Sequence, residues 1–62
     1  MNERLVQLLI AEIESLENNP LYDTLSDYDK GYLDGEHDHC ICILDELGIQ
    51  HNYTFRGAGY SD

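Results

Sequence analysis

Apolar residues recur at intervals of three and four in the first third of the chain, the spacing of one helix face. No Gly or Pro interrupts this pattern from about Asn2 to Asn18, and Asn2 suits a helix N-cap. The pattern therefore predicts a first helix that ends before Pro20. Its apolar positions are Leu5, Val6, Leu8, Leu9, Ile10, Ile13 and Leu16. They span an arc of about 200°, wider than one neighbouring helix covers, so a further element should pack on it.

A second helix is predicted to begin near residues 24–27 and to run to Leu47, where Gly48 ends it. Two patterns near its start, Thr24-x-x-Asp27 and Ser26-x-x-Asp29, are typical of a capping box. One side of its helical wheel carries the larger side chains, and this side is expected to face the core. These residues are Tyr28, Tyr32, His39, Ile43 and Leu47, extended by Leu33, Cys40 and Leu44.

Glycines mark two further features of the chain. Gly31 and Gly35 lie one turn apart inside the second helix, where each lowers helix stability by about 1 kcal/mol relative to Ala. They predict a close approach of another helix, a local break, or no special role. After Gly48, residues 49–55 alternate weakly between apolar and polar, which predicts a short strand or an extended arm. The glycine-rich segment 56–62 predicts a flexible tail.

The chain is therefore predicted to be all-α, with a helical hairpin over residues 1–49 and a C-terminal arm and flexible tail over 50–62. A lone hairpin of this size leaves much apolar surface exposed to water. The preferred prediction is a homodimer, in which two hairpins form a four-helix bundle. The alternative is a monomer whose C-terminal arm folds back over the first helix. The residues predicted to form the core or the dimer contact are Leu9, Ile13, Tyr32, His39 and Ile43.

The net charge of the chain indicates which classes of molecule it can bind. The 62 residues carry 13 Asp and Glu against 3 Lys and Arg, a formal net charge of -10. Such an excess repels nucleic acid and anionic membranes, and it attracts basic protein surfaces. The apolar run from Leu5 to Ala11 ends at Glu12, which fits neither a secretory signal nor a membrane span. We therefore expect a cytoplasmic protein that binds a basic protein surface, with no direct contact to nucleic acid or membrane.

Four acidic residues of the second helix fall within about 40° of one another on its wheel and predict an acidic stripe. They are Asp27, Asp34, Asp38 and Asp45. Tyr22 and its neighbours interleave aromatic and acidic residues, which favours a partner surface anchored by an aromatic ring. The alternative interpretation is a solvated face that keeps a small protein soluble. Replacing the four Asp by Asn is expected to abolish partner binding and to leave the helices intact.

Potential metal ligands are concentrated between Glu36 and Cys42, where His37, His39, Cys40 and Cys42 lie close together in the sequence. On a helix, residues two apart point about 200° apart, so this spacing does not converge on one ion. We predict no metal and no cofactor, with a metal-binding or metal-sensing module as an alternative. A Gly-rich phosphate loop and a nucleophile elbow are both missing from the sequence, and nearby carboxylates disfavour a thiolate. The sequence therefore predicts no enzymatic activity.

Residues Tyr28 to Gly35, Tyr-Asp-Lys-Gly-Tyr-Leu-Asp-Gly, followed by Leu44 to Ile49, Leu-Asp-Glu-Leu-Gly-Ile, resemble a pattern in short uncharacterised proteins of bacteriophages and their hosts. The resemblance covers about a third of the chain. It implies a phage context and, within it, the cytoplasm of the host. Small acidic phage proteins often inhibit host enzymes or defence systems, some by imitating nucleic acid. The hypothesis is therefore an acidic anti-defence inhibitor; a metal module and a small assembly or adaptor protein are the alternatives.

Overall fold

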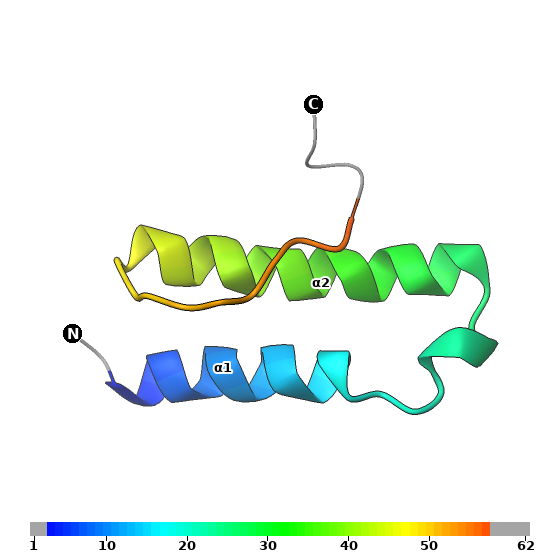
Figure 1. Ribbon diagram of the computed structural model, residues 1–62, viewed down its shortest axis with the longest axis horizontal. Coiled ribbons are helices and arrows are strands. Elements are labelled where there is room, and N and C mark those ends of the chain that lie inside the picture. The colour runs from blue at the N-terminus through cyan, green and yellow to red at the C-terminus, as the bar shows by residue number, and fades with distance from the viewer. Residues whose placement is uncertain (1–2, 58–62) are drawn as a thin grey trace.

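The computed structural model describes residues 3–57, which form two long helices and one short 3-10 turn. Helix α1 spans Glu3–Glu17, the 3-10 turn η1 spans Tyr22–Thr24, and helix α2 spans Asp27–Glu46. The two helices lie side by side and antiparallel, joined at one end by η1 (Figure 1). No strand occurs in the part of the chain that the structure describes. The predicted all-α hairpin is therefore confirmed, whereas its dimeric four-helix bundle stays a prediction.

Local signals in the sequence account for both ends of α2. Ser26 is the N-cap, and its Oγ accepts a hydrogen bond of 3.2 Å from the backbone N–H of Asp29. At the other end, Gly48 has φ of 75°, a conformation that favours glycine. The N–H groups of Gly48 and Ile49 donate to the carbonyls of Asp45 and Leu44, which is the pattern of a Schellman motif. The predicted cap and stop are thus both confirmed.

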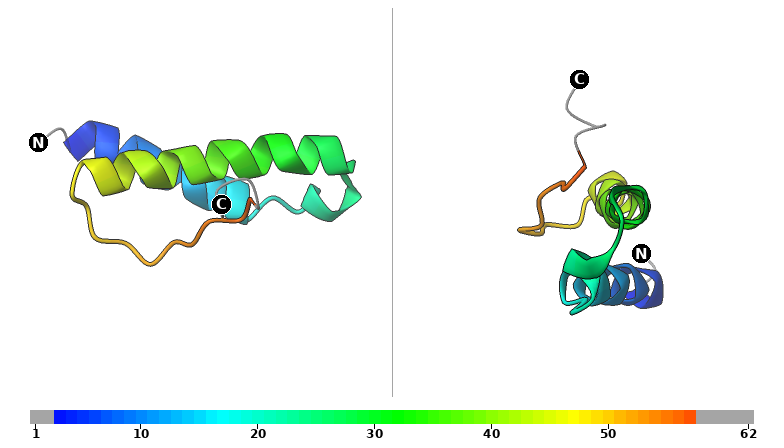
Figure 2. Two further views of the ribbon diagram at one scale, coloured as in Figure 1. Left: turned by 90° about the horizontal axis from the view of Figure 1, so that it is seen from above. Right: turned by 90° about the vertical axis from the view of Figure 1, so that its right-hand side faces the viewer.

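After Gly48 the chain reverses, and residues 50–57 run back along the hairpin as an extended arm without regular structure. The views in Figures 1 and 2 agree that the arm lies on one side of the two helices. Ile49, at its start, and Tyr53, within it, pack against the core. The arm therefore folds back beside the hairpin, as one part of the alternative to the dimer predicted, but Leu8 of α1 stays 61% exposed, so the arm does not cover the whole apolar face of α1. Residues 58–62, predicted to be a flexible tail, lie outside the described residues.

The core is formed by apolar side chains from both helices. Its buried residues are Leu9, Ile13, Ile41 and Leu44, with Leu16 buried at the end of α1. Of the residues predicted for the core, Leu9 and Ile13 are confirmed, and Ile43 is half-buried against the cluster. Burial of a small cluster from each helix is what holds the hairpin together, because it removes apolar surface from water.

Two other residues predicted for the core, Tyr32 and His39, are exposed within the chain. The prediction assumed that the larger side chains of α2 face inward. Instead, the buried residues of α2 are His37, Asp38, Ile41 and Leu44, so the inward side is rotated away from Tyr32 and His39 and shares only the edge of the predicted side that includes Leu44. The core assignment of Tyr32 and His39 is therefore wrong for the single chain, and a role in a dimer contact stays a prediction.

Gly31 and Gly35 lie within an uninterrupted helix, so the local break that was one interpretation of them does not occur. A Cβ added to either glycine would meet no atom within 4 Å. Both positions therefore have open space beside them in the single chain, and no other element within residues 3–57 approaches them closely.

Candidate functional site

The four acidic residues of the predicted stripe have four different surroundings. Asp27 is exposed at the start of α2, and Asp34 is half-buried and accepts a hydrogen bond from the Tyr22 hydroxyl at 2.9 Å. Asp38 has no exposed surface. Asp45 is exposed but lies 2.7 Å from Nε2 of His51 in the arm. The predicted continuous exposed stripe is therefore wrong, because the arm lies over this side of α2.

Asp38 is buried because it binds the arm. Its Oδ1 accepts a hydrogen bond of 2.8 Å from the backbone N–H of Arg56, and its Oδ2 accepts one of 2.7 Å from that of Gly57. A direct partner contact through Asp38 is thus excluded while the arm is in place. The expectation that the four Asp can be replaced by Asn with the helices intact stays a prediction, and at Asp38 such a change would alter two hydrogen bonds to the arm.

His37 completes this buried network, so the core histidine of the fold is His37 and not the predicted His39. Its Nδ1 lies 2.9 Å from Oδ1 of Asp38, and its Nε2 lies 2.7 Å from Oε2 of Glu17 on α1. Both ring nitrogens of His37 thus face a carboxylate oxygen, one on each helix. His37 therefore links α1 to α2, and both of its nitrogens are already engaged.

The pKa of Asp38 reflects opposing effects. Burial raises it, but the hydrogen bonds from His37 and from the backbone N–H groups of Arg56 and Gly57 lower it more. The net pKa of Asp38 lies below its ordinary value. The carboxylate therefore stays ionised inside the fold.

Arg56 lies against α1, η1 and α2 at once. Its Nη1 donates to the Leu16 carbonyl at 3.4 Å and lies 4.0 Å from Oδ1 of Asp34. Its guanidinium carbon is 5.2 Å from the centre of the Tyr22 ring, a distance that allows a cation–π contact. The hydrogen bond to Asp34, followed by burial, raises the pKa of Tyr22 above its ordinary value. Tyr22, Asp34 and Asp38, predicted to bind a basic partner, thus converge on the chain's own arginine.

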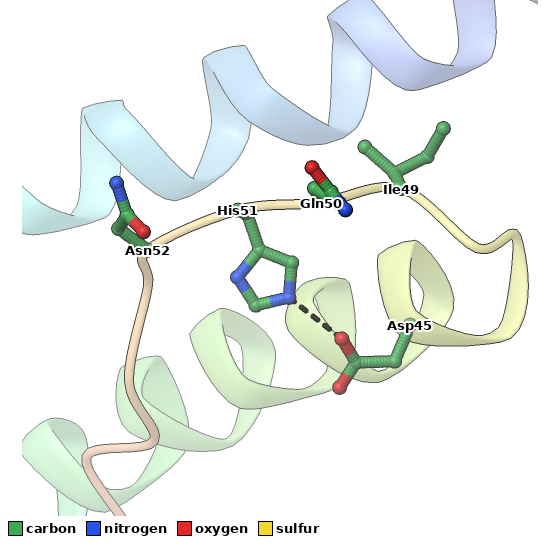
Figure 3. A pocket seen from close by; sticks show the side chains of 5 residues that line it. All are labelled: Asp45, Ile49, Gln50, His51 and Asn52. Atoms are coloured by element: carbon green, nitrogen blue, oxygen red, sulfur yellow. Dashed lines mark hydrogen bonds and ion pairs between the residues drawn. The ribbon is translucent and has the colours of Figure 1, made fainter.

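Tyr53 and His51 hold the middle of the arm against the two helices. The Tyr53 hydroxyl donates to Oε2 of Glu14 at 3.2 Å, and the Tyr53 ring stacks on His51. Figure 3 shows His51 pointing from the arm toward Asp45 on α2, beside an open pocket of about 530 Å³. Asp45, Ile49, Gln50, His51 and Asn52 line this pocket. Among these lining residues, His51 and Asp45 have titratable side chains, and they bind each other.

The end of the hairpin where η1 joins the helices combines exposed acidic and apolar side chains. Tyr28 is 83% exposed and Leu21 is 63% exposed, large fractions for such residues. The exposed carboxylates of Asp23, Asp27 and Asp29 lie in the same segment. We call Leu21, Asp23, Asp27, Tyr28 and Asp29 the connection end. Within residues 3–57, no basic side chain forms an ion pair with these three carboxylates, so their charge is available to a partner.

The potential metal ligands between Glu36 and Cys42 are dispersed by the helix. His37 is buried, His39 is exposed, and Cys40 and Cys42 are half-buried free thiols. Within the described residues, no three His, Cys, Asp or Glu side chains are grouped closely enough to hold a metal ion. Burial, followed by the charges of Glu12 and Glu36, raises the pKa of the Cys40 thiol. A raised pKa keeps the Cys40 thiol protonated at neutral pH, which makes it a poor nucleophile.

A second exposed surface, which we call the open face, combines residues of both helices. It includes Leu8 of α1, which is 61% exposed, and the exposed Leu5. It also includes a shallow hollow lined by Glu12, Gly31, Tyr32, Gly35, Glu36, His39 and Cys40. Because a Cβ at either glycine would have no neighbour within 4 Å, the hollow has room for side chains of another molecule.

We compared the chain with protein-family models, with curated proteins and with solved structures, and none of them matches it. Neither helix within residues 3–57 has the length and apolar character needed to cross a membrane.

Proposed function

We propose that the protein is a stoichiometric acidic inhibitor that binds a basic surface of a nucleic-acid-handling or defence protein through the connection end. The observation that carries this proposal is the large exposure of Tyr28 between the exposed carboxylates of Asp27 and Asp29. The net charge of -10 and the resemblance to short phage proteins favour the same interpretation. The protein acts by occupying the surface that its target needs, and it carries out no reaction.

Electrostatic attraction and apolar contact both contribute to binding at the connection end. The carboxylates steer a basic partner toward the connection end and set the orientation of the complex. Tyr28 and Leu21 supply the apolar contact area that long-range attraction alone lacks. The position of Asp27 and Asp29 in the first turn of α2 also favours the helix, since negative charge there complements the helix dipole. Substitutions should therefore remove the charge and keep the hydrogen-bonding shape, as Asn does.

The triple variant Asp23→Asn, Asp27→Asn, Asp29→Asn is expected to bind the target at least about tenfold more weakly than the wild type at low salt. Tyr28→Ala is expected to weaken binding about thirtyfold, the effect of losing an aromatic anchor. Candidate targets are captured from bacterial lysate on the immobilised wild type and purified. Their affinities are then measured by calorimetry across a salt gradient.

The matched control removes the same number of charges elsewhere: Glu3→Gln, Glu12→Gln and Glu46→Gln, all exposed and outside the connection end. This control should retain most of the affinity, because it changes the net charge but not the proposed contact. If the control loses as much affinity as the triple Asn variant, the connection end is not the binding surface. A captured protein whose affinity is unchanged by Tyr28→Ala also contradicts the proposal.

We further propose that the protein forms a homodimer through the open face. The exposed Leu8 and the open hollow around Gly31 and Gly35 support this assembly, because they offer apolar area and space for a second hairpin. The four helices of two such hairpins would then share the apolar arc of α1 that the arm leaves exposed.

The dimer predicts a particle of twice the 7.1 kDa chain mass in sedimentation equilibrium. Leu8→Glu should shift the mass to that of a single chain, since the second copy would have to bury a carboxylate. Leu21→Glu, at an equally exposed leucine outside the open face, should leave the mass unchanged. A wild type of single-chain mass at high concentration would contradict the dimer.

A further inference from the structure

The groups around Arg56 are those that proteins use to recognise an arginine. The Tyr22 ring faces the guanidinium, the Asp34 carboxylate supplies an opposite charge, and the Leu16 carbonyl accepts a hydrogen bond. An aromatic face and planar acceptors suit a guanidinium better than the ammonium of a lysine. We call the surface formed by Leu16, Tyr22, Asp34 and Asp38 the arginine groove.

Asp38 binds the backbone of the arm through hydrogen bonds that do not depend on the arm's side chains. Its two oxygens accept the N–H groups of two successive residues, Arg56 and Gly57, at 2.8 and 2.7 Å. Any extended segment with donors at these two positions can make the same pair of bonds. Because the arm covers Asp38, departure of the arm exposes this carboxylate and removes two of its donors. A second extended segment with two successive N–H donors can then take the place of the arm on Asp38.

The hydrogen bonds from the arm's backbone to Asp38 are short, whereas the contacts of the Arg56 guanidinium are long. Nη1 of Arg56 is 3.4 Å from the Leu16 carbonyl and 4.0 Å from Asp34, whereas charge-assisted hydrogen bonds of arginine are commonly about 2.7–2.9 Å. An arginine on an independent segment is not joined to α2 through residues 49–55 and can approach Asp34 from another direction. Nζ of Lys30 also lies 5.5 Å from the centre of the Tyr22 ring, so Arg56 shares this ring with a second cation and is not held closely by Asp34.

The arm can also leave without disrupting either helix. It is joined to α2 by Gly48, and residues 50–57 belong to no helix or strand. Of residues 49–57, Ile49 and Tyr53 pack against the hydrophobic core, and Phe55 is 48% exposed. Detachment of residues beyond Tyr53 therefore exposes the arginine groove while the hydrophobic cluster of Leu9, Ile13, Ile41 and Leu44 stays buried.

We infer that the arginine groove binds an extended, arginine-containing segment of the basic partner, and that Arg56 and Gly57 occupy it in the free protein as an internal competitor. This inference rests on the proposed function and names the part of the partner that is recognised. The partner's arginine takes the position between Tyr22 and Asp34, and its backbone takes the bonds to Asp38. The connection end, which includes the residue after Tyr22 in the chain, makes the surrounding contact.

The test uses a fluorescent peptide with the sequence of residues 53–57, acetyl-Tyr-Thr-Phe-Arg-Gly-amide, and the full-length protein. The Arg56→Ala variant should bind the peptide at least about tenfold more tightly than the wild type, because its own arm competes less well. Changing the peptide's Arg to Ala, or adding Asp34→Asn to the Arg56→Ala variant, should abolish this gain. Circular dichroism establishes that each variant is folded, and Arg56→Lys serves as the conservative variant, with an intermediate affinity.

Equal peptide affinities for the wild type and Arg56→Ala would overturn the inference, as would binding that does not depend on the peptide's arginine. A dimer that is lost in Arg56→Ala would also overturn it, since the occupant would then be the arm of a second copy. Failure of the proposed function is recognised separately, because the triple Asn variant of the connection end keeps Asp34 and Asp38 and should still bind the peptide. If the partner binds in a way that depends on Tyr28 but the peptide does not bind, the proposed function holds and the inference about the arginine groove is contradicted.

Discussion

Replacing Asp38 by Asn is expected to lower the free energy of unfolding by about 3 kcal/mol, although the two side chains have nearly the same shape. Asn can accept one of the two backbone hydrogen bonds, but its amide N–H₂ then faces a second donor. The charge that His37 meets inside the fold is also removed. For a chain of 62 residues, whose total stability is roughly 3–9 kcal/mol, this loss detaches the arm or unfolds the protein.

The same carboxylate makes stability depend on pH in a defined direction. The pKa of Asp38 is lower in the folded protein than its ordinary value of about 3.9. Its contribution is therefore complete above about pH 4 and is lost as the pH falls through the lower folded pKa. The difference in stability between the wild type and Asp38→Asn should be largest near neutral pH and should shrink in acid.

Urea unfolding at about pH 7 and about pH 3 measures both effects, and Asp27→Asn is the matched control because Asp27 is exposed. The control should change stability by less than about 1 kcal/mol at either pH. Hydrogen exchange at the Gly57 amide reports separately on the arm, since this N–H is protected only while it is bonded to Asp38. An Asp38→Asn protein as stable as the control, with a protected Gly57 amide, would show that the buried carboxylate does not hold the arm.

Asp38 also shows where the sequence ceases to predict the structure. Local signals are short-range, so the pattern of α1, the Ser26 cap and the Gly48 stop could all be predicted. Which side of α2 faces inward depends on contacts between residues far apart in the chain. Hydrophobicity placed Tyr32 and His39 inside, whereas the bonds of His37 to Glu17 and of Asp38 to the arm decide the rotation of the helix.

The candidate binding residues also differ in how far the sequence could predict their positions. Exposure of Asp27 and Tyr28 at the connection end follows from their place in the first turn of α2, next to a loop. The convergence of Tyr22 and Asp34 on Arg56 involves a residue far away in sequence, and the only sequence signal for it was the scarcity of basic residues. With three Lys and Arg in the chain, each had many carboxylates available, and the sequence alone could not select one.

Replacing Ile13 by Ala is expected to lower the free energy of unfolding by about 3–4 kcal/mol, because Ile13 is fully buried between the helices. This loss has two causes: the variant buries fewer apolar atoms on folding, and the missing atoms leave a cavity in the core. In so small a core there are few neighbouring side chains to fill that cavity, so relaxation recovers little of the loss.

Leu8→Ala is the matched control on the same helix, since Leu8 is largely exposed and should change the stability of the single chain by less than about 1 kcal/mol. Thermal unfolding at low protein concentration separates the two variants: Ile13→Ala should unfold at a much lower temperature than the wild type, and Leu8→Ala should unfold close to the wild-type temperature. At high concentration, a loss of stability in Leu8→Ala would instead reveal the dimer contact, because only association buries this leucine. Similar losses for both variants at low concentration would contradict the rotation of α1 in this fold, since Ile13 and not Leu8 faces α2.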